Sequence, residues 1–267
     1  YDLVLIDEVH YASDSKLQNN IKSKYIIGLT ARPIDSYGNA LEFDDIIDVI
    51  QLVDLINLGY ASPVKVLSTS KVDTSKLKTI GGDFSQKDSY ELMSKSQIKK
   101  DIVDTYLKYA KGLKTIVYAV NIKHCEELLK EFKDAGINAD SIHSKKTDTK
   151  KALEDFANNK IDVLINVDVL TTGYDAPDIY CLILASPTKS LIKSTQIYGR
   201  ATRLNPLDQN KEALIIDAAN VIENTQHPLQ RFDFKKTKKD NSKICKCGLK
   251  FKLINRNIKL LNEYEYT

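Results

Sequence analysis

The chain has 267 residues, of which 42% are hydrophobic and 28% charged, and its formal net charge is +3. This length and balance are typical of a globular protein with room for two compact units, each with its own core. They exclude a membrane-spanning protein, because no apolar run reaches bilayer length. The four Cys residues are too few for a disulfide framework, so we predict a reducing, cytoplasmic location.

Short apolar or β-branched runs recur along the chain and predict strands that are buried on both faces. These runs are Leu3–Ile6, Tyr25–Leu29, Val64–Leu67, Thr115–Ala119, Asp162–Asn166 and Tyr180–Ala185. Helical spacing of apolar residues between some of them predicts one helix over Ile122–Ala135, with a left-handed stop at Gly136, and another over Thr149–Asn158. The alternation predicts an α/β fold with parallel sheets covered by helices.

The segment 68–96 breaks this pattern with small polar residues and the Gly81-Gly82 pair, and it is predicted to be a linker. The first domain is therefore expected over residues 1–67 and the second over 97–233. Residues 234–267 form a predicted basic tail, in which positions 235–252 hold eight Lys against one Asp. Such a tail either contacts a polyanion or is simply solvated.

The opening run YDLVLIDEVH leads from a strand directly into Asp7, Glu8 and His10. Open α/β folds bind ligands at the carboxyl ends of their parallel strands, which is where these acids are expected. One acid can hold Mg²⁺ through its waters while the other orients an attacking water, as phosphoryl transfer requires. Taken alone, such a pair is more often a helix N-terminal charge pair or part of a solvated loop.

Four further segments give the acidic pair a context: GLTARP (28–33), TIVYAVNIKHCEEL (115–128), LINVDVLTTGYDAPDI (164–179) and QIYGRATR (196–203). With DEVH, they resemble in order and spacing the second to sixth motifs of the superfamily 2 helicases of the DEAD/DEAH-box type. The resemblance covers about residues 1–220 and is greatest to the branch that includes restriction-enzyme translocases and phage or bacterial helicases. It implies two RecA-like domains and a basic C-terminal tail.

The phosphate-binding loop of that family, GxxxxGK[ST], does not occur in the sequence. The resemblance therefore implies that the first domain is incomplete and that the loop precedes Tyr1. On this reading, the chain alone is expected to bind ATP weakly and to hydrolyse it negligibly.

The resemblance assigns roles to four residues of the first domain. Asp7 would hold Mg²⁺, and Glu8 would polarise the hydrolytic water. His10 and Thr30 would relay the state of the nucleotide to the nucleic-acid groove. Arg32 departs from the family, which usually carries a small hydroxyl or aliphatic residue there, and its partner could be a phosphate or an acid such as Asp35.

In the second domain, the resemblance implies that Gly173, Asp175 and Gln196 line the nucleotide. Arg200 and Arg203 are predicted to lie three residues apart on one helix and so near one face. A guanidinium fork suits the charge that develops on a transferring γ-phosphoryl group. The alternative for an isolated RxxR is a surface pair bonded to nearby acids.

Nucleic-acid contact is assigned to the hydroxyls of Thr171 and Thr172, which would bind phosphates with weak sequence preference. Either Thr alone could equally be a helix N-cap. ATP and Mg²⁺ are the implied cofactors, and nucleic acid is the implied partner, with DNA favoured over RNA. Zinc is not expected, because the CxC of ICKCGLKF (244–251) supplies two thiolates and a tetrahedral site needs four ligands.

Two functions from different classes follow. The first is an ATP-dependent helicase or translocase that couples hydrolysis to domain closure and strand movement. The second is a helicase remnant that binds nucleic acid without turnover. Retention of Glu8, Arg200 and Arg203 favours the motor, since a pure binder needs neither a water-activating acid nor a phosphate clamp.

Overall fold

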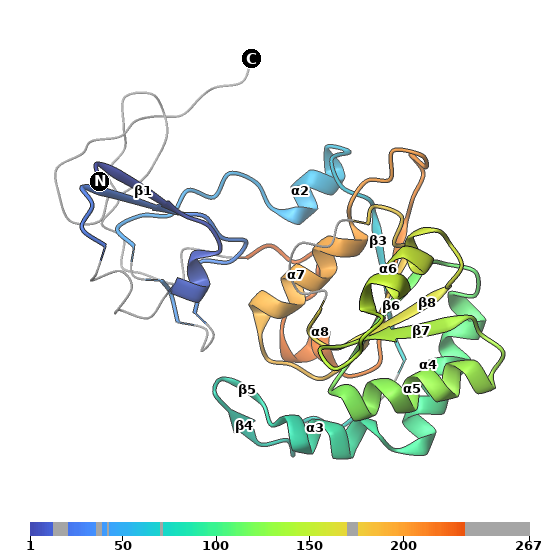
Figure 1. The fold of residues 1–267 in the computed structure, drawn as a ribbon. Helices are drawn as coiled ribbons and strands as arrows, with labels where there is room; N and C mark the ends of the chain where they lie inside the picture. The colour runs from blue at the N-terminus through green and yellow to red at the C-terminus, as the bar shows by residue number, and fades with distance from the viewer. Residues whose placement is uncertain (13–20, 36–38, 42, 70–71, 170–175, 233–267) are drawn as a thin grey trace. The chain divides into compact units, whose positions relative to one another are not determined.

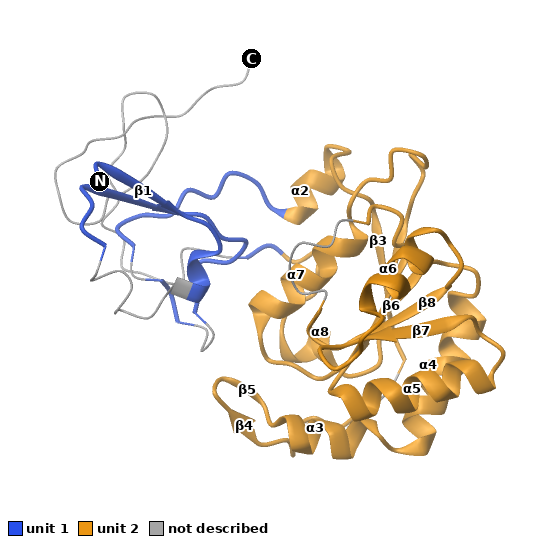
Figure 2. Ribbon diagram, in the orientation of Figure 1, with its two compact units in different colours: residues 1–51, 231–267 blue, residues 52–230 orange. Residues whose placement is uncertain are grey.

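The computed structural model describes residues 1–12, 21–35, 39–41, 43–69, 72–169 and 176–232 (Figure 1). The chain divides into two compact units (Figure 2). Unit 1 comprises residues 1–51 and 231–267, and unit 2 comprises residues 52–230. Among the described residues, no helix is both long and apolar enough to span a membrane.

Unit 1 contains two parallel strands, β1 (Leu3–Ile6) and β2 (Tyr25–Gly28), which pair in register from Leu3 with Tyr25 to Ile6 with Gly28. A 3-10 helix, η1 (Val9–Ala12), follows β1. The prediction that these strands are buried on both faces is wrong for this pair. Leu3 and Leu5 are 50% and 62% exposed, because their outer faces have no cover among the described residues.

Unit 2 is built on six parallel strands in the order β3-β10-β9-β6-β8-β7. Every residue of β6, β8 and β9 is buried, which confirms the predicted two-sided burial at the centre of the sheet. The strands are β3 (Val64–Ser68), β6 (Thr115–Ala119), β7 (Ala139–Ile142), β8 (Val163–Asn166), β9 (Cys181–Ala185) and β10 (Ala213–Asp217).

Helices cover both faces of this sheet, with α4 and α5 on one side and α6 and α7 on the other (Figure 1). The two predicted helices are confirmed as α5 and α6, and Gly136 after α5 has the left-handed φ of 73° that a helix stop requires. The helices of unit 2 are α2 (Leu52–Asn57), α3 (Gln86–Met93), α4 (Ser96–Tyr109), α5 (Ile122–Asp134), α6 (Thr149–Ala157), α7 (Leu191–Ala201) and α8 (Val221–Asn224).

The expected domain limits differ from those observed. Strand β3 pairs with β10, so its residues belong to unit 2 and the boundary falls at residues 51–52. The predicted linker 68–96 contains α3 and an antiparallel hairpin of β4 (Thr79–Ile80) and β5 (Asp83–Phe84). Asp83 anchors the hairpin by accepting hydrogen bonds from the Thr188 hydroxyl at 2.6 Å and the Lys189 backbone N–H at 2.7 Å.

Candidate functional site

In unit 1, the acidic pair lies just beyond the paired region of β1. Backbone hydrogen bonds from Leu29 N–H to Ile6 (2.8 Å) and from Val9 N–H to Leu29 (3.0 Å) continue the contact between the two segments past the strand ends. Asp7 and Glu8 therefore stand at the carboxyl edge of the strand pair. Glu8 has φ of 46°, an uncommon conformation for a residue with a side chain, and its N–H donates to Asp7 Oδ1 at 2.9 Å.

His10 connects this acidic turn to the end of β2. Its side chain is 1% exposed, and Nδ1 lies 2.8 Å from Thr30 Oγ1 and 3.3 Å from Glu8 Oε2. The Thr30 hydroxyl donates its single proton to the Arg32 carbonyl at 2.8 Å, so it must accept from His10. His10 Nδ1 therefore carries a proton, which it donates to Thr30.

Burial lowers the pKa of His10, and the nearby Glu8 carboxylate opposes part of that shift. Burial dominates, so the imidazole is neutral at pH 7 and acts as a fixed hydrogen-bond donor through Nδ1. The structure thus brings Glu8, His10 and Thr30 together. The assigned coupling role of His10 and Thr30 stays a prediction.

Arg32 contacts Phe232, a residue that was not predicted from the sequence to lie near it. Its guanidinium lies 4.9 Å from the centre of the Phe232 ring, a cation–π contact that joins residues 200 positions apart. Burial lowers the pKa of Arg32, and Asp48 opposes the shift. Gln51 holds Phe232 in place through two hydrogen bonds to its backbone, at 2.7 and 3.0 Å. No local pattern in the sequence signals this pairing.

In unit 2, α7 carries Gln196 and Arg200. Arg200 is buried, with 5% exposure, whereas Gln196 is half-buried. The prediction that Arg200 and Arg203 share one helix face is wrong, because α7 ends at Ala201 and Thr202 is its C-cap. Arg203 is exposed on the turn that follows the helix.

The charges of both arginines nonetheless influence Tyr118, at the carboxyl end of β6. Burial raises the pKa of Tyr118, and the positive charges of Arg200 and Arg203 both oppose that shift. Both guanidinium groups therefore lie within electrostatic reach of the same hydroxyl. Tyr118 also lines a small cavity of about 10 Å³ together with Asn166, Asp168 and Lys193, at the same edge of the sheet.

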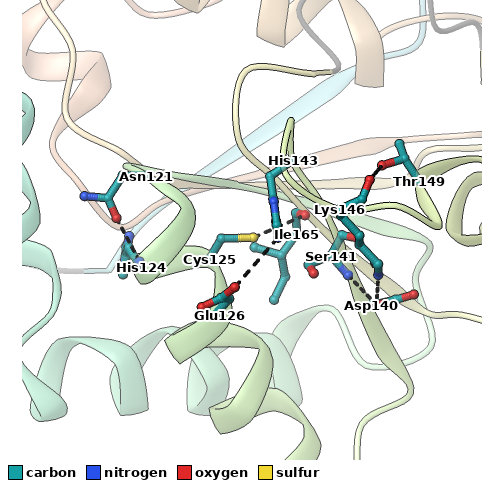
Figure 3. Close-up of polar contacts among 10 residues, drawn as sticks. All are labelled: Asn121, His124, Cys125, Glu126, Asp140, Ser141, His143, Lys146, Thr149 and Ile165. Atoms are coloured by element: carbon teal, nitrogen blue, oxygen red, sulfur yellow. Dashed lines mark hydrogen bonds and ion pairs between the residues drawn. The ribbon is translucent and has the colours of Figure 1, made fainter.

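Four predicted residues, Thr171, Thr172, Gly173 and Asp175, lie outside the described residues, and so does the CxC pair of the tail. The other two Cys residues are core residues as expected: Cys125 and Cys181 are buried, and burial raises the pKa of each thiol to about 12. Figure 3 shows Cys125 beside Ile165, whose carbonyl lies 3.6 Å from Sγ, and His143 directed toward Glu126. His143 Nε2 is 3.9 Å from that carboxylate.

Comparison with known proteins identifies the larger unit. Residues 98–205 match the family described as the helicase conserved C-terminal domain. A 51.5 kDa protein of a Lactococcus phage (isolate 7-9) is 34% identical over 222 residues, which cover 80% of this chain and 48% of that protein. The Saccharomyces cerevisiae protein IRC3, named for an ATP-dependent helicase, is 30% identical and is matched over 76% of this chain and 32% of its own length.

Among solved structures, a fragment described as the HsdR subunit of a type I restriction enzyme from Vibrio vulnificus YJ016 superposes with a TM-score of 0.60 at 22% identity. The match covers 84% of this chain and 45% of that one. This chain thus spans about half the length, or less, of these three proteins.

The six-stranded parallel sheet with helices on both faces is a RecA-like α/β domain. Residues 98–205 match the helicase conserved C-terminal domain, and the phage and yeast relatives are consistent with a fragment of a superfamily 2 helicase.

Proposed function

We propose that the chain forms part of an ATP-dependent helicase or translocase that acts on nucleic acid, with DNA favoured over RNA. The observation that carries the proposal is the Glu8–His10–Thr30 cluster, in which a carboxylate at a strand end lies 3.3 Å from a buried, neutral imidazole. A carboxylate in this position suits the orientation of an attacking water.

The residues of the acidic turn also fit a metal-bound nucleotide. Asp7 is exposed at the strand end and offers the hard carboxylate oxygen that Mg²⁺ prefers. We assign Asp7 to Mg²⁺, which when bound would neutralise charge on the phosphate oxygens. Glu8 would then orient and polarise the water, while His10 holds Glu8 and Thr30 in a fixed relation.

The second domain would supply the rest of the site. We assign Arg200 and Arg203 to the charge that develops on the γ-phosphoryl group, and Gln196, Gly173 and Asp175 to the nucleotide. Domain closure would assemble these groups around the triphosphate, and opening after hydrolysis would change the grip on the strand. Strand phosphates would be bound by Thr171 and Thr172.

The test compares Glu8→Gln with wild type in a protein that joins this chain to a phosphate-binding segment of the GxxxxGK[ST] type. We expect single-stranded DNA to stimulate ATP turnover in the wild type and Glu8→Gln to lower it by about 100-fold or more, with DNA affinity retained. Glu91→Gln, which changes an exposed acid on α3, is the matched control. A wild type that binds DNA without any turnover would instead identify a non-catalytic binder.

The nucleic-acid class is tested in the same assay. We expect single-stranded DNA to stimulate turnover more than RNA of the same sequence and length. Equal or greater stimulation by RNA would contradict the proposed preference.

Arg203→Ala is expected to lower turnover at least tenfold, as loss of a charge-stabilising contact does.

A further inference from the structure

Lys211 is a buried cation in unit 2 to which the proposed mechanism gives no role. It lies in the turn between Arg203 and β10, and only 2% of the residue is exposed. Its ammonium donates one hydrogen bond to the Pro177 carbonyl at 2.7 Å and another to the Arg203 carbonyl at 2.8 Å. One side chain thus joins the backbone before β9 to the backbone just past the end of α7.

The same end of α7 is held from a second direction by Ser62, which precedes β3. The Ser62 hydroxyl donates to the Arg203 carbonyl at 3.0 Å, and the Ser62 N–H donates to the Thr202 carbonyl at 2.7 Å. The last carbonyls of a helix, including that of the C-cap, have no partner within the helix. Ser62 supplies a donor to the C-cap carbonyl of Thr202, and Ser62 and Lys211 both donate to the next carbonyl, that of Arg203.

The surroundings of Lys211 are partly charged and partly aromatic. Its ammonium lies 5.6 Å from the centre of the Tyr180 ring, and the Tyr180 hydroxyl contacts Asp208 at 2.8 Å and Asn205 at 3.1 Å. Burial lowers the pKa of Lys211 to about 8. The carboxylates of Asp178 and Asp208 oppose the shift, and the like charge of Arg203 adds to it.

We propose that Lys211 is a positioning residue that fixes the backbone at Arg203 and so aims the Arg203 guanidinium. The inference rests on the proposed function, because it matters for activity only if Arg203 contributes to phosphoryl transfer. A buried ammonium is costly, and an apolar side chain of similar length would leave the two carbonyls without this donor. Lys211 is therefore better explained by the two carbonyls that it holds than by packing.

Protonation of Lys211 makes its positioning role depend on pH, which a role in packing alone would not. The folded-state pKa of about 8 is below the usual value for Lys, so the unfolded chain binds the proton more tightly between pH 8 and 10.5. Deprotonation across that window therefore increases the contribution of Lys211 to stability, while it weakens the hydrogen bonds to the two carbonyls. Activity and stability are expected to change in opposite directions as the pH rises.

The first experiment uses this chain without nucleotide. Hydrogen–deuterium exchange of residues 200–206 is compared in wild type, Lys211→Met and Lys130→Met, the last of which changes a lysine whose side chain is 79% exposed on α5. We expect exchange to increase about tenfold in Lys211→Met alone, as loss of a charge-assisted hydrogen bond implies. Equal exchange in the two variants would overturn the inference, whatever the chain does with ATP.

The second experiment uses the joined protein described above. We expect Lys211→Met to lower kcat and kcat/KM equally, by about tenfold, because misalignment of Arg203 affects the transition state. Lys211→Arg, whose cation does not titrate, is expected to retain turnover and to move the loss of activity from about pH 8 to higher pH. An unchanged pH profile in Lys211→Arg would overturn the inference even if Lys211→Met fails to fold. If Arg203→Ala loses turnover and Lys211→Met does not, the proposed function stands and only the positioning role of Lys211 is refuted.

Discussion

Gly28 offers a direct test of the geometry around the acidic turn. A Cβ added there would lie 2.7 Å from Val9 Cγ1, 3.0 Å from Val9 Cβ and 2.7 Å from Phe43 Cζ. Phe43 can rotate away at its ring end, but Val9 is β-branched, 1% exposed and directly bonded to His10. Gly28→Ala must therefore displace the start of η1 or push β2 away from it.

Overpacking of this kind costs about 1–3 kcal/mol, or roughly 5- to 150-fold in a local opening constant. Because a chain of two units does not unfold in one step, the assay is hydrogen exchange of peptides that cover residues 1–12 and 25–35. We expect their protection to fall by that factor in Gly28→Ala.

Gly199 provides a control of opposite sign. Apart from its chain neighbours and the backbone of its own helix, no described atom lies within 4 Å of a Cβ at Gly199, and the residue is inside α7. Gly199→Ala should therefore stabilise the helix by about 0.5–1 kcal/mol.

Unchanged protection of both strands in Gly28→Ala would refute the close packing of Val9 on Gly28.

Two further predictions concern buried titratable groups, and one concerns the core. Burial lowers the pKa of His124 to about 4, so the unfolded chain binds the proton more tightly between pH 4 and 6.5. The free energy of unfolding should fall by roughly 3 kcal/mol as the pH drops through that window, and His124→Gln, measured by urea unfolding, should lack this dependence. The thiols of Cys125 and Cys181 should resist iodoacetamide at pH 8 until the chain is unfolded, as mass spectrometry of their peptides would report; rapid labelling in the native chain would contradict their burial. Phe132→Ala should destabilise unit 2 by about 3–5 kcal/mol in the same urea assay, since Phe132 is fully buried against Tyr106, and a loss below 1 kcal/mol would count against that packing.

Sequence patterns were sufficient for much of unit 2. Central strands such as β6 and β9 are short apolar runs, and α5 has both a helical apolar repeat and a glycine stop, so local signals agree with the fold. Strand β7 escaped prediction because it is an edge strand that contains Asp140 and Ser141. Strand β10 was also missed, although its run ALIID is as apolar as the others.

The candidate site divides in the same way. The position of Asp7, Glu8, His10 and Thr30 near the strand ends could be predicted, because motif order and strand ends are visible in the sequence. The geometry at Arg203 could not be predicted in this way. The prediction from the three-residue spacing assumed that one helix carries both Arg200 and Arg203, whereas α7 ends with the Thr202 cap, before Asn205 and Pro206. Lys211 and Phe232 carry no local signal, because their partners are distant in the chain and are set by tertiary packing.

The pairing of β3 with β10 has a practical consequence for anyone preparing the larger unit alone. A shortened protein that begins at residue 97 would lack β3 and would leave the N–H and C=O groups along one side of Ala213–Asp217 open to other chains. Open strand edges promote self-association and poor solubility. A protein that begins at residue 52 keeps that border closed by its own backbone.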